Sequence, residues 1–161
     1  MAKNIERPII FPLSNPTSRC EATPQQIVDW TEGKALIGTG SPFGPAQFKG
    51  KEVPFAQTNN SYIFTGLALG ILSSHARHAS DAMIKASALA LAELYPTRKD
   101  EQGGSCHRYP ASAPSAKAVA RAVGQKAIRE GLAEVEEPGL EKELAANFWE
   151  PLHETYELSK L

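Results

Sequence analysis

The sequence predicts an α/β protein: the C-terminal part of a doubly wound parallel sheet, mostly helical after residue 60. Two observations indicate this class. The apolar runs 8–13 and 35–38 flank a helical pattern, which is the strand, helix, strand order of a parallel sheet. From residue 60 onward, apolar residues recur at helical spacing. Because two parallel strands cannot form a stable sheet alone, the earlier strands of the sheet are expected to be missing from this chain.

The first strand and the first helix are marked by residues at their ends. Residues 8–13 (PIIFPL) are typical of a buried parallel strand, and pairing is expected to stop near Pro12, which lacks a backbone donor. Residues 23–26 (TPQQ) form a capping box with proline at the first helical position, so a helix should start there. Ile27 and Trp30 are expected to share one face of that helix.

The second strand follows after a glycine. Gly33 should end the first helix, and residues 35–38 (ALIG) form the next strand. The stretch from about 39 to 58 reads as a loop, which is long for a compact domain and therefore suggests a functional segment.

The segment after residue 60 should consist of helices. Residues 63–73 are apolar on nearly every face, as in a helix packed on all sides. A helix capped by Ser80 should place Ile84, Ala88 and Leu91 on one face. The remaining elements are a loop over 97–113, a helix over 114–130 closed by Gly131, and an amphipathic tail over 140–158 with Phe148, Trp149 and Tyr156.

Composition excludes several function classes. The 17 basic and 18 acidic residues are mixed along the chain, so no electrostatic footprint for nucleic acid is visible. The longest apolar stretch, 62–72, is far shorter than the roughly 20 residues of a membrane span, so no membrane partner is expected. No secretory signal is recognisable, which predicts a cytoplasmic location where Cys20 and Cys106 stay thiols.

Three residue pairs have both a chemical and a structural interpretation. Asn59 and Asn60 precede an apolar run, where neutral amides can grip a carboxylate or carboxamide, or one of them can simply cap a helix. His75 and His78 have a spacing that can hold a metal, but without a neighbouring carboxylate motif a polar helix end is favoured. Cys106-His107 resembles a nucleophile beside a base, yet adjacent residues on an extended loop point apart, which favours an incidental thiol.

Three motifs in order resemble the malic enzymes. Residues 7–17 (RPIIFPLSNPT) are similar to the RPIIF-x-x-SNPT strand and turn of that family, 39–43 (TGSPF) to its (S/T)GSPF loop, and 57–64 (QTNNSYIF) to its Q-x-NN-x-YIF segment. The resemblance continues through 30–33 (WTEG) to 147–149 (NFW) and covers essentially the whole chain. It implies the C-terminal part of a Rossmann-like NAD-binding domain of the bacterial NAD-dependent type.

The resemblance also implies a reaction and a set of binding residues. Malic enzymes oxidise and decarboxylate L-malate to pyruvate and carbon dioxide, reducing NAD or NADP with Mg²⁺ or Mn²⁺ present. Carried over from the family motifs, Asn15 and Asn59 are expected to bind the substrate, while Asn15 and Asn60 are expected to lie against the cofactor. Ala56 and Thr58 depart from glycines found in many relatives, which affects the loop backbone more than the amides.

The same resemblance implies what this chain does not supply. The family's tyrosine acid, lysine base, metal-binding carboxylates and glycine-rich turn lie N-terminal to the matched segment, so no catalytic residue and no metal ligand is expected here. We therefore expect a truncated gene product, an engineered piece or a misplaced start codon, inactive alone. Residues 1–138 would be the C-terminal portion of the NAD-binding domain and 139–161 a helical tail. The alternative is a non-catalytic module that forms a homo-oligomer or associates with a full-length subunit.

Overall fold

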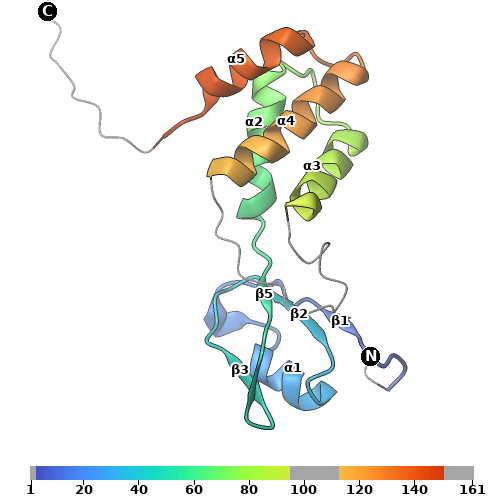
Figure 1. The fold of residues 1–161 in the computed structure, drawn as a ribbon, viewed down its shortest axis with the longest axis vertical. Helices are drawn as coiled ribbons and strands as arrows, with labels where there is room; N and C mark the ends of the chain where they lie inside the picture. The colour runs from blue at the N-terminus through green and yellow to red at the C-terminus, as the bar shows by residue number, and fades with distance from the viewer. Residues whose placement is uncertain (1–2, 95–112, 151–161) are drawn as a thin grey trace, which may run out of the picture.

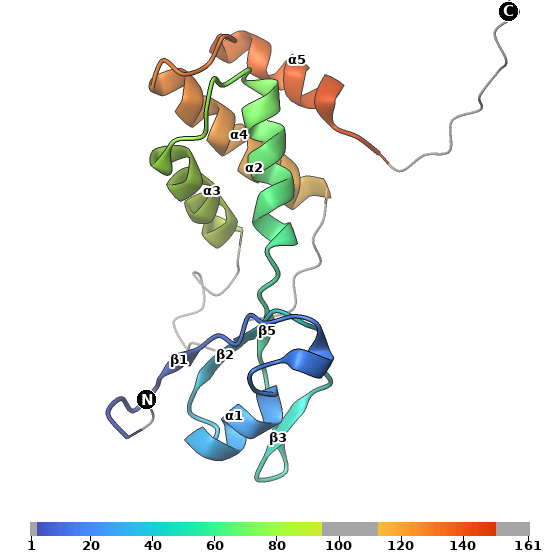
Figure 2. The same cartoon turned by 180° about the vertical axis from the view of Figure 1, so that it is seen from behind.

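The computed structural model describes residues 3–94 and 113–150, which form two parts stacked along the longest axis (Figures 1 and 2). The first part, here called the sheet unit, contains the strands that the structure describes and one of its α-helices. The second part, here called the helical bundle, contains the four later α-helices. The extensive contacts between described elements lie within each part. The chain passes from one part to the other where the last strand leads into the first bundle helix.

The sheet unit has the predicted strand, helix, strand order. β1 (Ile9–Ile10) pairs in parallel with β2 (Leu36–Thr39), and β2 pairs in parallel with β5 (Ala56–Gln57), giving the order β1-β2-β5. Between β1 and β2 lies α1 (Pro24–Thr31), whose capping box is complete: Thr23 accepts from the Gln26 backbone, and the Gln26 side chain accepts from the Thr23 backbone. The α/β class predicted from the sequence is confirmed.

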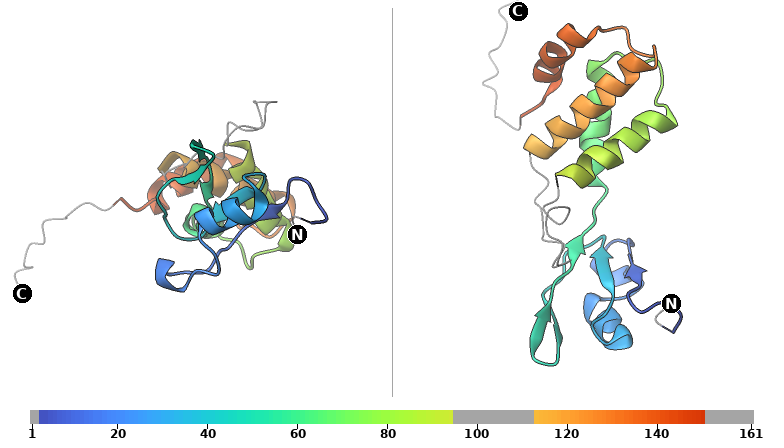
Figure 3. Two further views of the ribbon diagram at one scale, coloured as in Figure 1. Left: turned by 90° about the horizontal axis from the view of Figure 1, so that it is seen from below. Right: turned by 45° about the vertical axis from the view of Figure 1, so that its right-hand side comes forward.

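The long loop predicted between residues 39 and 58 is wrong, because this stretch contains three strands. β3 (Ala46–Phe48) and β4 (Lys51–Val53) form an antiparallel hairpin, and the third strand is β5. The two residues between β3 and β4, Lys49 and Gly50, both have positive φ, 50° and 76°, which matches the turn preferred in two-residue hairpins. Figure 3 shows this hairpin projecting away from the helical bundle.

One face of α1 packs on the sheet. Ile27 and Val28 are buried against Ala35, Ile37 and residues of β3. The prediction that Trp30 shares the face of Ile27 is wrong, since the Trp30 side chain is 65% exposed. The buried arc of the helix is centred between Ile27 and Val28, and Trp30 lies beyond its flank.

The helical bundle contains the helices predicted after residue 60. They are α2 (Ser61–Ser73), α3 (Asp81–Glu93), α4 (Ala113–Arg129) and α5 (Glu137–Asn147). α4 contacts the other three helices, most extensively α2. Ser80 caps α3 by accepting a hydrogen bond from the Met83 backbone, as predicted.

The buried face of α3 differs from the prediction. Met83 and Ser87 are fully buried, whereas Ile84 and Ala88 are exposed. Leu91 packs against the cluster around Met83. Among the described elements, α3 makes its extensive contacts with α4 and α2, and its opposite apolar flank, which includes Ile84 and Leu89, is exposed.

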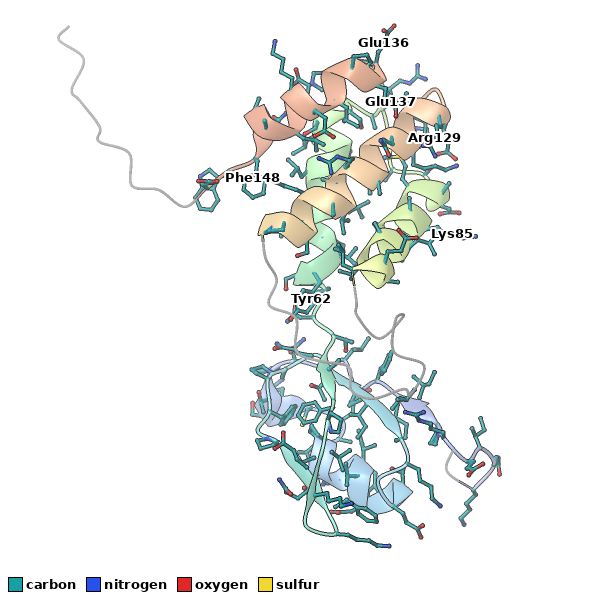
Figure 4. All side chains as sticks on the ribbon, in the orientation of Figure 1. Tyr62, Lys85, Arg129, Glu136, Glu137 and Phe148 are labelled. Atoms are coloured by element: carbon teal, nitrogen blue, oxygen red, sulfur yellow. The ribbon has the colours of Figure 1, made fainter. Side chains whose placement is uncertain are left out.

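Close contact with α4 covers only one side of α2. Its buried residues include Gly66, Leu69 and Gly70, while Phe64 and Leu72 are exposed, so the prediction of a helix packed on all sides is wrong within the described residues. Tyr62 lies at the first turn of α2, where the bundle meets the sheet unit (Figure 4).

The end of the chain is described as far as residue 150. α5 closes onto α4 through the Phe148 ring, whose centroid lies 4.1 Å from the Lys117 Nζ (Figure 4). Trp149 is exposed, and most of the predicted loop 97–113 and the tail beyond 150 with Tyr156 lie outside the described residues. No helix among the described residues is both long and apolar enough to span a membrane.

Candidate functional site

The predicted site residues lie at the carboxyl edge of the parallel sheet. Asn15 follows β1, Gly40 and Ser41 follow β2, and Asn59 follows β5. The carboxyl ends of parallel strands meet at one edge, and open α/β sheets bind ligands in the crevice there. Three segments that are distant in sequence therefore converge because the strands before them are neighbours.

Asn15 is held by one side chain and one carbonyl. The Ser41 hydroxyl donates to Asn15 Oδ1 over 2.5 Å, and Asn15 Nδ2 donates to the Leu13 carbonyl oxygen over 3.3 Å. Asn15 itself is exposed, whereas Ser41 is only 3% exposed. The peptide bond to Pro16 is cis, and the short 3-10 helix η1 (Thr17–Arg19) follows. The exposed amide is thus fixed from the buried side.

Asn59 makes a capping contact, which is one of the two interpretations that the sequence left open. Its Oδ1 accepts from the Ser61 backbone N–H over 2.9 Å, which satisfies one of the unpaired donors at the start of α2. Its Nδ2 donates to the Gly40 carbonyl oxygen over 3.2 Å. Asn60 is the N-cap residue of α2 by position, but its exposed side chain makes no capping hydrogen bond. Asn59 therefore caps the helix and also contacts the site.

Gly40 lies close to both asparagines, at a position where only a glycine fits. A Cβ at this position would lie 2.4 Å from the Leu13 carbonyl oxygen and 3.1 Å from Asn15 Nδ2. The Gly40 N–H donates to the Pro12 carbonyl oxygen, so backbone hydrogen bonding between the two segments continues as far as Pro12. Sequence reasoning did not single out Gly40 and Ser41 as site residues. The TGSPF motif was the signal, and the contacts that it makes became visible only in the fold.

The two asparagines present hydrogen-bond donors. Each side-chain oxygen already accepts a hydrogen bond, and each nitrogen donates one of its two N–H groups to a backbone carbonyl. One N–H of each amide has no partner among the described residues. An amide is neutral at any ordinary pH, so this pair can bind an acceptor group such as a carboxylate without changing its own protonation state.

The other candidate residues have structural contacts or lie outside the described part. His75 Nε2 is 3.6 Å from Glu143 Oε2, which connects the end of α2 to α5. Across residues 3–94 and 113–150, no group of three or more His, Cys, Asp or Glu side chains could hold a metal ion. Cys20 is a partly buried free thiol. Cys106 and His107 lie outside the described residues.

Fold and site together define an α/β protein that has a ligand-type site of neutral donors at the carboxyl edge of a parallel sheet. The family profile described as "Malic enzyme, NAD binding domain" matches residues 1–130. The chain therefore belongs to the malic enzyme NAD-binding domain family, as the resemblance of its motifs predicted.

Individual relatives agree with this assignment. The NAD-dependent malic enzymes of Shewanella frigidimarina and Erwinia tasmaniensis are each 48% identical to this chain over 157 residues, covering 97% of this chain. This chain spans 28% of the length of those relatives.

Two solved structures resemble the fold. The malic enzyme of Entamoeba histolytica, at 24% identity, superposes with a TM-score of 0.63 over 84% of this chain and 25% of that one. The malic enzyme of Pyrococcus horikoshii, at 27% identity, gives 0.60 over 86% and 28%. The fold class, C-terminal part of a Rossmann-like sheet followed by helices, is confirmed.

Proposed function

We propose that this chain contributes the substrate-binding asparagines of a malic-enzyme-type reaction, the oxidative decarboxylation of L-malate to pyruvate and carbon dioxide with reduction of NAD or NADP. The observation that carries the proposal is the convergence of Asn15 and Asn59 on Gly40 and Ser41 at the carboxyl edge of the sheet. Family membership and the names of the relatives support the same reaction.

In this proposal each asparagine donates its free N–H to a malate carboxylate. Hydrogen bonds to an ionised acceptor are shorter and stronger than those between neutral groups, so two neutral amides suffice to orient a dianionic substrate. Asn15 and Asn60 would also contact the cofactor. The exposed Asn60 amide has no capping hydrogen bond and fits a nicotinamide carboxamide, which offers both a donor and an acceptor. NAD or NADP would accept the hydride when it is bound.

We further infer that this chain does not turn malate over by itself. Removal of hydride from a secondary alcohol requires a base for the hydroxyl proton, and decarboxylation requires a Lewis acid that stabilises the developing enolate. Neutral amides can do neither. The described residues do not offer a ligand set for Mg²⁺ or Mn²⁺, so no step in this proposal runs through a metal held by this chain. A cytoplasmic location, the domain division at residue 138 and homo-oligomer formation remain predictions.

A second candidate function is association with another chain, such as a full-length relative. It is favoured by an uncovered apolar surface on β1 and the segment that follows it, where Ile9, Phe11 and Leu13 are 57%, 51% and 52% exposed. Parallel sheets are normally covered on both faces, and no described element covers this one. A folded monomer on size-exclusion chromatography that does not associate with a full-length relative would contradict this function.

The first experiment is a titration of the chain with L-malate, followed by NMR of the backbone and side-chain amides. Asn59→Asp is the sharpest variant, because an aspartate oxygen can still accept from the Ser61 N–H, while the free N–H and the N–H on the Gly40 carbonyl are both replaced by a negatively charged oxygen. We expect binding at least about tenfold weaker in Asn59→Asp and in Asn15→Asp, since a charge-assisted hydrogen bond becomes a repulsion. Asn147→Asp, on α5 in the helical bundle, adds the same charge away from the site and is the control.

The interpretation of this titration is direct. If wild type binds malate and the two site variants bind it equally well, the proposed role of the asparagines is wrong. Purified chain mixed with malate, NAD and Mn²⁺ should produce no NADH by absorbance. Steady NADH production would overturn the inference that the chain is inactive alone.

A further inference from the structure

Ser41 is a buried residue whose side chain hydrogen-bonds the exposed Asn15 amide. Its hydroxyl donates to Asn15 Oδ1 over 2.5 Å, across 26 positions of sequence. Ser41 is 3% exposed, and its own carbonyl oxygen accepts from Thr39 Oγ1 over 2.9 Å. Thr39 is fully buried. Ser41 is therefore held in a buried part of the sheet edge, where its backbone is hydrogen-bonded to Thr39.

An exposed asparagine without such contacts would have two freedoms that weaken ligand binding. The side chain could rotate into solvent, and the amide could turn over so that the oxygen faces the ligand. The Leu13 carbonyl accepts only, so it requires the Asn15 nitrogen on its side. Ser41 then supplies the matching donor on the oxygen side, and together the two contacts fix both the position and the orientation of the amide.

Gly40 is what brings this support within reach. The backbone of Gly40 approaches Leu13 so closely that a Cβ would lie 2.4 Å from the carbonyl oxygen. Because Ser41 is the next residue, the same close approach sets its hydroxyl beside Asn15. The Asn59 amide is oriented in the same way: its oxygen accepts from the Ser61 N–H, and its nitrogen donates to the Gly40 carbonyl oxygen.

We propose that Ser41 is a positioning residue of this site: its hydroxyl holds the Asn15 amide with a free N–H directed to the ligand, which favours a carboxylate over a carboxamide. This inference rests on the proposed function, because it assumes that Asn15 binds the substrate. A carboxylate offers acceptors to both asparagines, whereas a carboxamide would set its own NH₂ group against one of the two donors. Preorganising the donor lowers the entropic cost of binding.

The test compares four variants in the ¹⁵N- and ¹³C-labelled chain. Ser41→Ala removes the hydroxyl, Ser41→Cys keeps the shape but gives only a weak donor, and Ser41→Thr keeps a hydroxyl. Ser14→Ala is the matched control, because Ser14 lies next to Asn15 but hydrogen-bonds Glu21 instead. The readouts are the Asn15 side-chain resonances without ligand, the affinity for L-malate, and the affinity for the malate monoamide.

We expect Ser41→Ala and Ser41→Cys to shift the Asn15 side-chain resonances and to weaken malate binding about tenfold. The preference for malate over its monoamide should fall in the same two variants. Ser41→Thr should restore most of both, and Ser14→Ala should change neither. A purely structural role of Ser41 would lower stability without changing the preference between the two ligands, and that result would overturn the proposal.

The failure of this inference and the failure of the proposed function give different results. If wild type binds malate and the Ser41 variants match it in affinity and preference, Ser41 is not a positioning residue, although the proposed function stands. If wild type does not bind malate, the proposed function of this chain is wrong. In that case the Asn15 side-chain resonances test the contact between Ser41 and Asn15. A shift of these resonances in Ser41→Ala but not in Ser14→Ala supports the contact, and the absence of a shift overturns it.

Discussion

Gly70 lies where α2 packs against α4, and Gly70→Ala tests this contact. A methyl group at this position would lie 2.6 Å from the Ala120 carbonyl oxygen and 2.7 Å from the Val123 Cβ. Gly66, one turn earlier in α2, would place a methyl 2.6 Å from the Val119 Cβ. Both separations are far below van der Waals contact. These two glycines therefore let the backbones of α2 and α4 approach closely.

Two opposing terms decide the effect of Gly70→Ala on the free energy of unfolding. Replacing glycine by alanine inside a helix stabilises it by about 1 kcal/mol through helix propensity. Overpacking a close contact typically costs about 1–3 kcal/mol. One of the atoms in the way is a helix carbonyl oxygen, which cannot rotate aside, so the cost should lie in the upper part of that range. We expect a net loss of about 1–2 kcal/mol.

Urea unfolding followed by far-ultraviolet circular dichroism measures this difference. The matched control is Gly139→Ala in α5, where the nearest contact for a new methyl is a side-chain atom of Val135 at 3.1 Å. The control should be neutral or more stable by up to about 1 kcal/mol. If Gly70→Ala stabilises the chain as much as Gly139→Ala does, α2 and α4 do not pack as described. Because Asn59 hydrogen-bonds the first residue of α2, Ser61, the loss should also weaken malate binding.

The remaining predictions concern stability. Thr58→Val should raise the free energy of unfolding by about 1 kcal/mol, because it removes a buried hydroxyl that has no partner among the described residues. Thr39→Val should lower it by about 1–3 kcal/mol, because it breaks the hydrogen bond to the Ser41 carbonyl. Changes of the same sign in urea titrations would contradict this pair. The hydrogen bond from Arg121 lowers the pKa of Glu141, so that ion pair stabilises the chain above the unfolded carboxyl pKa of 4.5 and loses its contribution as the pH falls through the lower folded pKa. Both side chains are at least half exposed, so the ion pair contributes less than about 1 kcal/mol. Arg121→Gln should therefore lower the free energy of unfolding slightly, and this loss should shrink below pH 4.5. A loss that is the same at every pH would refute the assignment.

Elements with local signals were predicted well. The capping box before α1, the Ser80 cap of α3 and the glycine after α4 each depend on residues within a few positions of one another. The hairpin of β3 and β4 was missed because its strands are three residues long and its turn begins with Lys49 rather than the usual Asn or Asp. β5 was missed for a related reason: a two-residue strand is defined by pairing with β2, which leaves no periodicity to read.

Which helix faces are buried also could not be predicted. Ile84 and Met83 are both apolar and adjacent in α3, yet one is 49% exposed and the other fully buried. Periodicity identifies an apolar face, but it does not say which neighbouring helix will cover it. α4 lies on the Met83 side, and that placement depends on contacts between residues far apart in the sequence.

The sequence by itself determined the α/β class, the order of most elements, the family motifs and the two asparagines most expected to bind substrate. These are properties of residue type and local spacing. Only the tertiary structure decided that Asn15 and Asn59 meet at Gly40 and that Ser41 supports Asn15, because hydrogen bonds between residues 19 and 26 positions apart depend on the pairing of β1, β2 and β5. The donor character of the site arises there, since the partner of each amide oxygen decides which atom remains free.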